Sequence, residues 1–177
     1  MKLNLVQDFP TGIYDYNLLT SAFVALAPVN ARPAGSPTKV SFSAQEWCGH
    51  VYTQVLFDAR YARFATHSYF DTEADSAASL EMPSDVLSED ALLIWARGFS
   101  PPVLAPGESA DRPLLGSLRH ARLLHEPLVV TPAHFTRAAA GGAGVRAQPA
   151  ANSAASSSAP RALTSGAPLP RARTRGR

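Results

Sequence analysis

The chain has 177 residues, with 16 Lys or Arg, 14 Asp or Glu and one cysteine. A single cysteine excludes an internal disulfide and a zinc site built only from cysteines, and no apolar run approaches the roughly 18 residues of a membrane-spanning helix. Residues 1–136 hold nine Lys or Arg against all 14 acids, a net charge of −5, whereas residues 137–177 carry seven arginines and no acid.

The N-terminal region predicts a strand, a turn, a helix and a loop in that order. Residues 2–9 alternate weakly between apolar and polar, and Pro10-Thr11-Gly12 is typical of a turn. Residues 13–27 place leucines and alanines near helical spacing, although the alternation that begins at Tyr14 also fits a strand. We expect a helix here, followed by a loop over the proline-rich residues 30–38.

Residues 39–70 give the clearest structural pattern in the chain. Apolar and polar residues alternate through residues 40–44, 51–57 and 61–70, and Asp58-Ala59-Arg60 has the length of a hairpin loop. Such alternation is typical of strands with one face on the core and one toward water. We therefore expect an antiparallel sheet built on this hairpin.

The next region predicts one more strand and a short helix. A strand is expected over residues 76–82, and a helix over residues 89–97 with Ser88 as its N-cap and Arg97-Gly98 as its end. Residues 114–135 fit either a helix from Leu114 to His125 or two strands. The predicted fold class is α+β, mainly an antiparallel sheet with one or two short helices.

The C-terminal residues 137–177 have the composition of a disordered tail. They contain no aromatic residue, and their Ala, Ser, Pro, Gly and Arg follow no period. Such a segment buries too little apolar surface to offset the entropy lost on ordering. We expect one globular domain over residues 1–136, and no nucleic-acid partner, because the basic charge is confined to the tail.

The segment Glu46-Trp47-Cys48-Gly49-His50 concentrates the residues that could carry chemistry. It resembles half of a thioredoxin-type redox motif, but Val51 stands where the second cysteine would be. One hypothesis makes Cys48 a nucleophile, with His50, His67 or another histidine as its base and Glu46 or an aspartate as the group that orients the base. The interpretation we prefer places Trp47 and Cys48 in the core and Gly49 at a bulge.

A metal site at the same hairpin is a further hypothesis. His50 and His67 would come within one residue of direct opposition, and Cys48 and Asp71 could complete a set of zinc ligands. A histidine on a strand is more often a surface residue or a satisfied core residue. We therefore expect no metal and no other cofactor.

Three segments, residues 9–16, 40–50 and 68–71, together resemble a group of uncharacterised bacterial exported proteins, often lipoproteins, that are sometimes labelled septum formation inhibitor. The resemblance covers residues 2–137, and the members of that group are longer at both ends. It implies a β-rich protein of the cell envelope and no catalytic residue. Taken as written, the chain has no export signal and is expected to be soluble and unexported.

These patterns favour a non-enzymatic, envelope-associated binding or structural protein. Its curved sheet is expected to hold a small apolar ligand or an envelope protein partner. The alternative is a thiol-dependent redox protein or hydrolase that uses Cys48 with His50.

Overall fold

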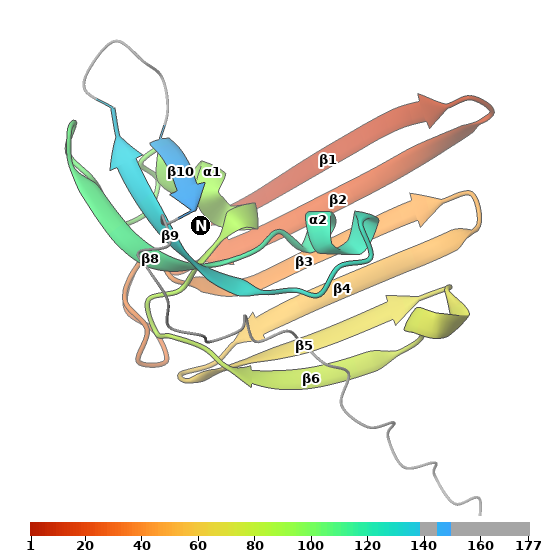
Figure 1. Cartoon of the computed structure of the whole chain (residues 1–177), viewed down its shortest axis with the longest axis horizontal. Coiled ribbons are helices and arrows are strands. Elements are labelled where there is room, and N and C mark those ends of the chain that lie inside the picture. The colour runs from red at the N-terminus through yellow and green to blue at the C-terminus, as the bar shows by residue number, and fades with distance from the viewer. Residues whose placement is uncertain (139–144, 150–177) are drawn as a thin grey trace, which may run out of the picture.

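The computed structural model describes residues 1–138 and 145–149, which form two β-sheets and several short helices. In the larger sheet each of six strands pairs with the next along the chain, always antiparallel (Figure 1). These strands are β1 (Lys2–Thr11), β2 (Tyr14–Val24), β3 (Pro37–Glu46), β4 (Gly49–Phe57), β5 (Tyr61–Ser68) and β6 (Ser76–Glu81). The predicted fold class and the predicted hairpin loop at residues 58–60 are confirmed.

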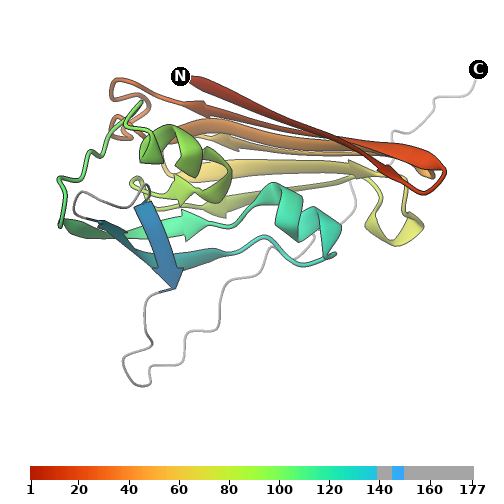
Figure 2. The same ribbon diagram turned by 90° about the horizontal axis from the view of Figure 1, so that it is seen from above.

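A second layer covers part of one face of this sheet (Figure 2). Its four strands are β7 (Leu87–Ser88), β8 (Ser109–Leu115), β9 (Val130–Arg137) and β10 (Val145–Pro149), in the order β10-β9-β8-β7, with β7 parallel to β8. The helical segments are η1 (Asp71–Glu73), η2 (Glu89–Ala91), α1 (Leu92–Ala96) and α2 (Leu118–Leu123). The tip of the β1–β2 hairpin extends beyond α2, so this end of the larger sheet is not covered by the second layer (Figure 2).

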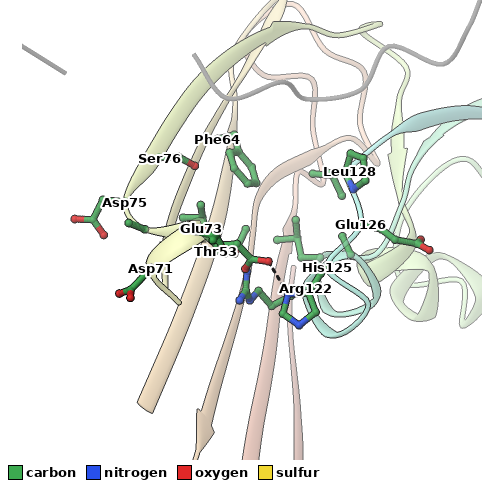
Figure 3. Close-up of a pocket in the computed structure, with 16 residues that line it drawn as sticks. Thr53, Phe64, Asp71, Glu73, Asp75, Ser76, Arg122, His125, Glu126 and Leu128 are labelled. Atoms are coloured by element: carbon green, nitrogen blue, oxygen red, sulfur yellow. Dashed lines mark hydrogen bonds and ion pairs between the residues drawn. The ribbon is translucent and has the colours of Figure 1, made fainter. Parts of the chain in front are cut away.

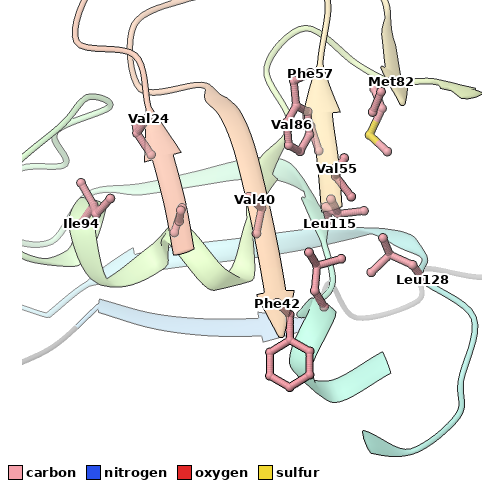
Figure 4. Packing of buried hydrophobic residues seen from close by; sticks show 14 of the residues in the cluster. Val24, Val40, Phe42, Val55, Phe57, Met82, Val86, Ile94, Leu115 and Leu128 are labelled. Atoms are coloured by element: carbon pink, nitrogen blue, oxygen red, sulfur yellow. The ribbon is translucent and has the colours of Figure 1, made fainter. Parts of the chain in front are cut away.

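Side chains alternate across the larger sheet as the sequence predicts. Val40, Phe42 and Ala44 of β3 are buried, and Val55 and Val51 of β4 lie opposite the first and last of them. We call this buried side the inner face and the opposite side the outer face. The second layer adds Ile94, Leu115, Leu118 and Leu128 to the same core (Figure 4). Burying an aliphatic or phenyl side chain stabilises a fold by about 1.5–3 kcal/mol.

The helix predicted over residues 13–27 is wrong, because Tyr14–Val24 forms β2. The alternation in this segment is the pattern that the fold uses: Leu18, Thr20 and Ala22 are buried on the inner face. β2 lies between β1 and β3, so its backbone groups are paired on both sides. Pairing and burial of this kind outweigh a helical spacing of leucines and alanines.

The helix predicted over residues 89–97 is shorter than expected. It is a 3₁₀ turn, η2, followed by α1, and it ends as predicted at Gly98, which has φ +72° and donates its amide to the Trp95 carbonyl at 2.8 Å. Ser88 is not the predicted cap, since its side chain makes no capping bond. Ser88 instead pairs with Leu115 in the second sheet, where its hydroxyl is buried without a partner in the described part of the chain.

The region from residue 114 to 135 follows neither predicted alternative. β8 ends at Leu115, α2 is a helix of six residues, and β9 begins at Val130. Ser117 caps α2, because its hydroxyl accepts a hydrogen bond from the His120 amide at 3.3 Å. Of the predicted tail, residues 139–144 and 150–177 lie outside the described residues, whereas Val145–Pro149 forms β10 in place of the predicted disorder.

A buried arginine ties together three connections of the larger sheet. Arg32, in the β2–β3 loop, is 1% exposed. It donates to the backbone carbonyls of Asp58 at 2.5 Å, Pro83 at 2.9 Å and Ser84 at 3.4 Å. Its guanidinium also lies 5.6 Å from the ring centre of Phe57. The end of the sheet opposite the β1–β2 hairpin is therefore closed by polar contacts as well as by apolar packing.

Candidate functional site

A groove of about 460 Å³ lies between the inner face of the larger sheet and α2 (Figure 3). Thr53, Phe64 and Thr66 of β4 and β5 line it from the sheet, and Leu118 and Leu128 line it from the second layer. A volume of this size is within the range of small-molecule sites, which are mostly apolar with a few polar groups. The groove therefore has the size that a small ligand requires. Its lining combines apolar side chains, such as Phe64, Leu118 and Leu128, with a larger number of polar and charged residues.

An ionic cluster closes one side of the groove. Glu73 of η1 accepts a hydrogen bond from Arg122 of α2, and its other oxygen is 2.6 Å from Nδ1 of His125 (Figure 3). Arg122 also donates to the Ser68 hydroxyl at 3.1 Å, and its side chain is 9% exposed. The guanidinium is thus committed to protein groups and is not available to an incoming anion.

The carboxyl of Asp90 holds α2 in place over the groove. It accepts hydrogen bonds from the Ser117 hydroxyl at 2.7 Å and from the Leu118 amide at 2.8 Å. Burial raises the pKa of Asp90, and this effect outweighs the two hydrogen bonds, which act in the opposite direction. Asp90 therefore acts as a distant cap for a helix that is too short to be stable alone.

Opposing effects act on the pKa of Glu73. Burial raises it, but the hydrogen bonds from His125 and Arg122, together with their charges, hold the pKa below its ordinary value of 4.5. The charged form of Glu73 is therefore the form that the fold stabilises. Loss of that charge in acid weakens the contact between η1 and α2.

We expect Glu73→Gln to make the protein less stable at neutral pH and to flatten the pH dependence of its stability. Because the folded-state pKa is lowered, the contribution of Glu73 is fully present above the unfolded value and is lost as the pH falls through the folded value. Urea unfolding from neutral pH to about pH 3 should show the gap between the two proteins closing in acid. A gap that stays constant would contradict this role of Glu73.

The hairpin between β3 and β4 places Trp47 and Cys48 at its tip. Glu46 pairs with Gly49, so the two residues between them form the loop. Trp47 is 66% exposed and Cys48 is also exposed. The interpretation that placed both side chains in the core is therefore wrong. Apolar and polar residues alternate before and after Trp47 and Cys48, and this alternation does not reveal that the chain reverses between the two strands.

Glu46 and His50, the two candidate partners of Cys48, lie on opposite faces of the larger sheet. Glu46 is two residues beyond the buried Ala44 in β3 and therefore faces the inner side of the sheet. His50 pairs with Gln45, faces the outer side and is exposed. Glu46 accepts a hydrogen bond from the Tyr69 hydroxyl at 2.6 Å. The fold therefore does not bring Cys48, His50 and Glu46 together as a catalytic triad.

The two histidines of the metal hypothesis share the outer face but are not opposite each other. His67 pairs with Tyr52, two residues along β4 from His50, and its Nδ1 is 2.9 Å from Asp75. Within residues 1–138 and 145–149, no three His, Cys, Asp or Glu side chains are arranged to hold a metal ion. Asp71, the acid of the metal hypothesis, begins the 3₁₀ turn η1, and this turn places Glu73 in the groove.

Cys48 is expected to react with a thiol reagent in the folded protein nearly as fast as in urea. Its place at an exposed hairpin tip leaves the sulfur accessible without unfolding. Reaction with Ellman's reagent, followed with and without denaturant, measures both rates. A folded-state rate slower by about a hundredfold would mean that the thiol is protected, contrary to this geometry.

Comparisons with known proteins add no relative: no protein family, no curated protein and no solved structure matches the chain. In the described part of the chain, no helix has the length and apolar character needed to cross a bilayer.

The groove and its ionic cluster were not identified from the sequence. The one signal was the acidic run from Asp71 to Asp75, which by itself is typical of a solvated turn.

Proposed function

We propose that this protein is a non-enzymatic binding protein and that the groove beneath α2 takes a small ligand with an apolar body. The observation that carries the proposal is the groove itself, with Phe64 and Leu128 facing each other across it (Figure 3). The ionic cluster of Glu73, Arg122 and His125 is internally paired. It fixes the wall of the groove, and the apolar lining supplies the binding energy.

A neutral apolar fluorophore, N-phenyl-1-naphthylamine, tests this function directly. Its fluorescence is expected to rise when it enters the groove of the full chain. Ser76→Trp, on the inner face of β6, fills part of the groove and should weaken binding about tenfold or more. Ser79→Trp is the matched control, because Ser79 is exposed and lies on the outer face of the same strand.

Two outcomes would contradict the proposal. The first is the absence of any fluorescence rise with the wild-type chain. The second is equal binding by the Ser76→Trp and Ser79→Trp variants, which would place the probe outside the groove. Thermal unfolding of both variants checks that the larger side chain has not disrupted the sheet.

We further propose a place in the cell envelope, which rests on the resemblance of residues 9–16, 40–50 and 68–71 to exported bacterial proteins. Fractionation of the native cells with an antibody against this chain is the test. Recovery of the protein only with the cytosolic fraction would overturn this location and leave the groove proposal unaffected.

The second candidate function is a thiol-dependent redox or hydrolytic activity at Cys48, and the exposure of that residue favours it. His50 and Glu46 lie on opposite faces of the sheet, so the two cannot act together as base and orienting group for Cys48. Cys48→Ser would abolish it and would leave binding in the groove unchanged.

A further inference from the structure

A strip of aromatic side chains lies near the tips of the β1–β2 and β3–β4 hairpins. Figure 2 shows that the tip of the β1–β2 hairpin extends beyond α2. We call it the aromatic strip; its six members are Phe9, Tyr14, Tyr16, Trp47, Tyr69 and Phe70. Phe9 stacks on Tyr16 with ring centres 5.7 Å apart, and Tyr14 stacks on Trp47 at 4.6 Å. Tyr69 stacks on Phe70 at 4.3 Å. The six rings thus form three stacked pairs, which lie along one end of the larger sheet.

Gly49 explains how the ring of Tyr69 reaches this surface. A Cβ atom on Gly49 would lie 2.8 Å from Cγ of Tyr69, so the ring packs directly on the glycine backbone. Its hydroxyl then donates to Oε2 of Glu46, and that bond raises the pKa of Tyr69 to about 12. The segment that first resembles a redox motif is thus built to hold aromatic rings and a carboxylate side by side.

The strip has open ring faces that a ligand can contact. Trp47 stacks on Tyr14 through one face yet is 66% exposed, so its other face is open to solvent. Phe9 stacks on Tyr16 through one face and is 40% exposed, so its other face is also open to solvent. An open indole face next to a carboxylate is a favourable place for a cationic group, because the ring quadrupole and the acid both attract it.

The charges around the strip have one predominant sign. Glu46 lies within it, and Asp71, at the start of η1, follows Phe70 directly and is exposed. The guanidinium of Arg122 lies over the ring of Phe70. It is already paired with the carboxylate of Glu73. A cationic ligand would therefore meet acids here without competition from an uncommitted arginine.

The length of the strip indicates an extended ligand. Its members run from β1 to the end of β5, and five neighbouring strands span about 19 Å at a spacing of about 4.8 Å. That span corresponds to about six residues of extended chain. In an extended peptide alternate side chains point the same way, so a basic residue at every second position would present a row of cations to the rings.

We propose that the aromatic strip binds an extended peptide segment of a partner protein that carries arginine or lysine at alternate positions. Planar guanidinium groups stack on the open faces of Trp47 and Phe9, and Glu46 and Asp71 pair with their charges. This surface adjoins the groove, and Asp71 lines the groove as well.

Isothermal titration calorimetry of the full chain with a capped octapeptide of alternating arginine and alanine tests the proposal. Trp47→Ala is expected to weaken binding about tenfold, and Glu46→Gln about fivefold with a smaller dependence on salt. Tyr61→Ala is the matched control, because Tyr61 is an exposed aromatic residue on the outer face of β5 and should not affect the affinity. The groove-filling Ser76→Trp variant should also bind the peptide normally.

The proposal is overturned if an octapeptide of alternating glutamate and alanine binds equally well, or if Trp47→Ala and Tyr61→Ala have the same effect. Binding of a neutral β-linked glucose hexamer in preference to the basic peptide would overturn it in favour of a carbohydrate surface. Thermal unfolding of each variant verifies that the sheet is intact. Glu46→Gln retains an acceptor for the Tyr69 hydroxyl, so it tests the charge without removing that bond.

Discussion

Replacing Arg32 by methionine is expected to lower the free energy of unfolding by about 3 kcal/mol, although the two side chains have similar volumes. The guanidinium is 1% exposed and donates to the carbonyls of Asp58, Pro83 and Ser84. Methionine can fill much of the space but leaves these carbonyls without a donor. Urea unfolding of the wild-type and variant proteins, followed by far-UV circular dichroism, measures the difference.

Burying the charge of Arg32 is itself unfavourable, and this cost offsets part of what its hydrogen bonds contribute. Burial lowers the pKa of Arg32, with the charge of Asp58 acting in the opposite direction, and Nη2 has no hydrogen-bond partner in the described part of the chain. Part of the energy of the three bonds is therefore offset by the cost of burying the charge. A loss of less than about 1 kcal/mol would mean that the carbonyls find other partners in the variant.

Arg63→Met is the matched control for this prediction. Arg63 lies on the outer face of β5, and its Nε is 3.7 Å from the carboxylate of Asp58. Both side chains of the pair are more than half exposed, so the ion pair contributes less than about 0.5 kcal/mol. The comparison separates a buried arginine that joins three loops from a surface arginine near the same turn.

Gly35→Ala is expected to destabilise the protein by at least about 3 kcal/mol, because a methyl group there has no room. Gly35 has φ +90°, and a Cβ atom there would overlap the backbone oxygen of Pro101. Backbone atoms cannot rotate away as the end of a long side chain can. Either the β2–β3 loop or the segment after α1 must move, and the hydrogen bond from the Gly35 amide to the Ala25 carbonyl is then strained.

Gly107→Ala isolates the contribution of the backbone conformation. Gly107 has φ +87°, nearly the same as Gly35, but a Cβ atom there would meet no atom of the described residues within 4 Å. Its cost is therefore the conformational strain alone, about 1–2 kcal/mol. Urea unfolding of both variants tests the argument, and equal losses would show that the contact with Pro101 has no energetic effect.

The alternation of apolar and polar residues determined much of the larger sheet. The strands around Val40 and Val55, the loop at residues 58–60 and the strand near residue 76 all follow from a period of two, because alternate side chains of a strand face opposite sides. The end of α1 at Gly98 was also readable from sequence, since a glycine tolerates the positive φ that stops a helix. These features depend on residues close together in the chain.

Only the tertiary structure decided the features that depend on distant partners. Residues 14–24 form a strand because β1 and β3 flank them, and Trp47 is exposed because the chain reverses at the tip of a hairpin that alternation alone cannot locate. The groove likewise joins Thr53 to Glu73 and Leu128, and Arg32 finds its acceptors up to 52 residues away. A local pattern fixes which side of a strand a residue faces, but the neighbour across that face is chosen by packing over the whole fold.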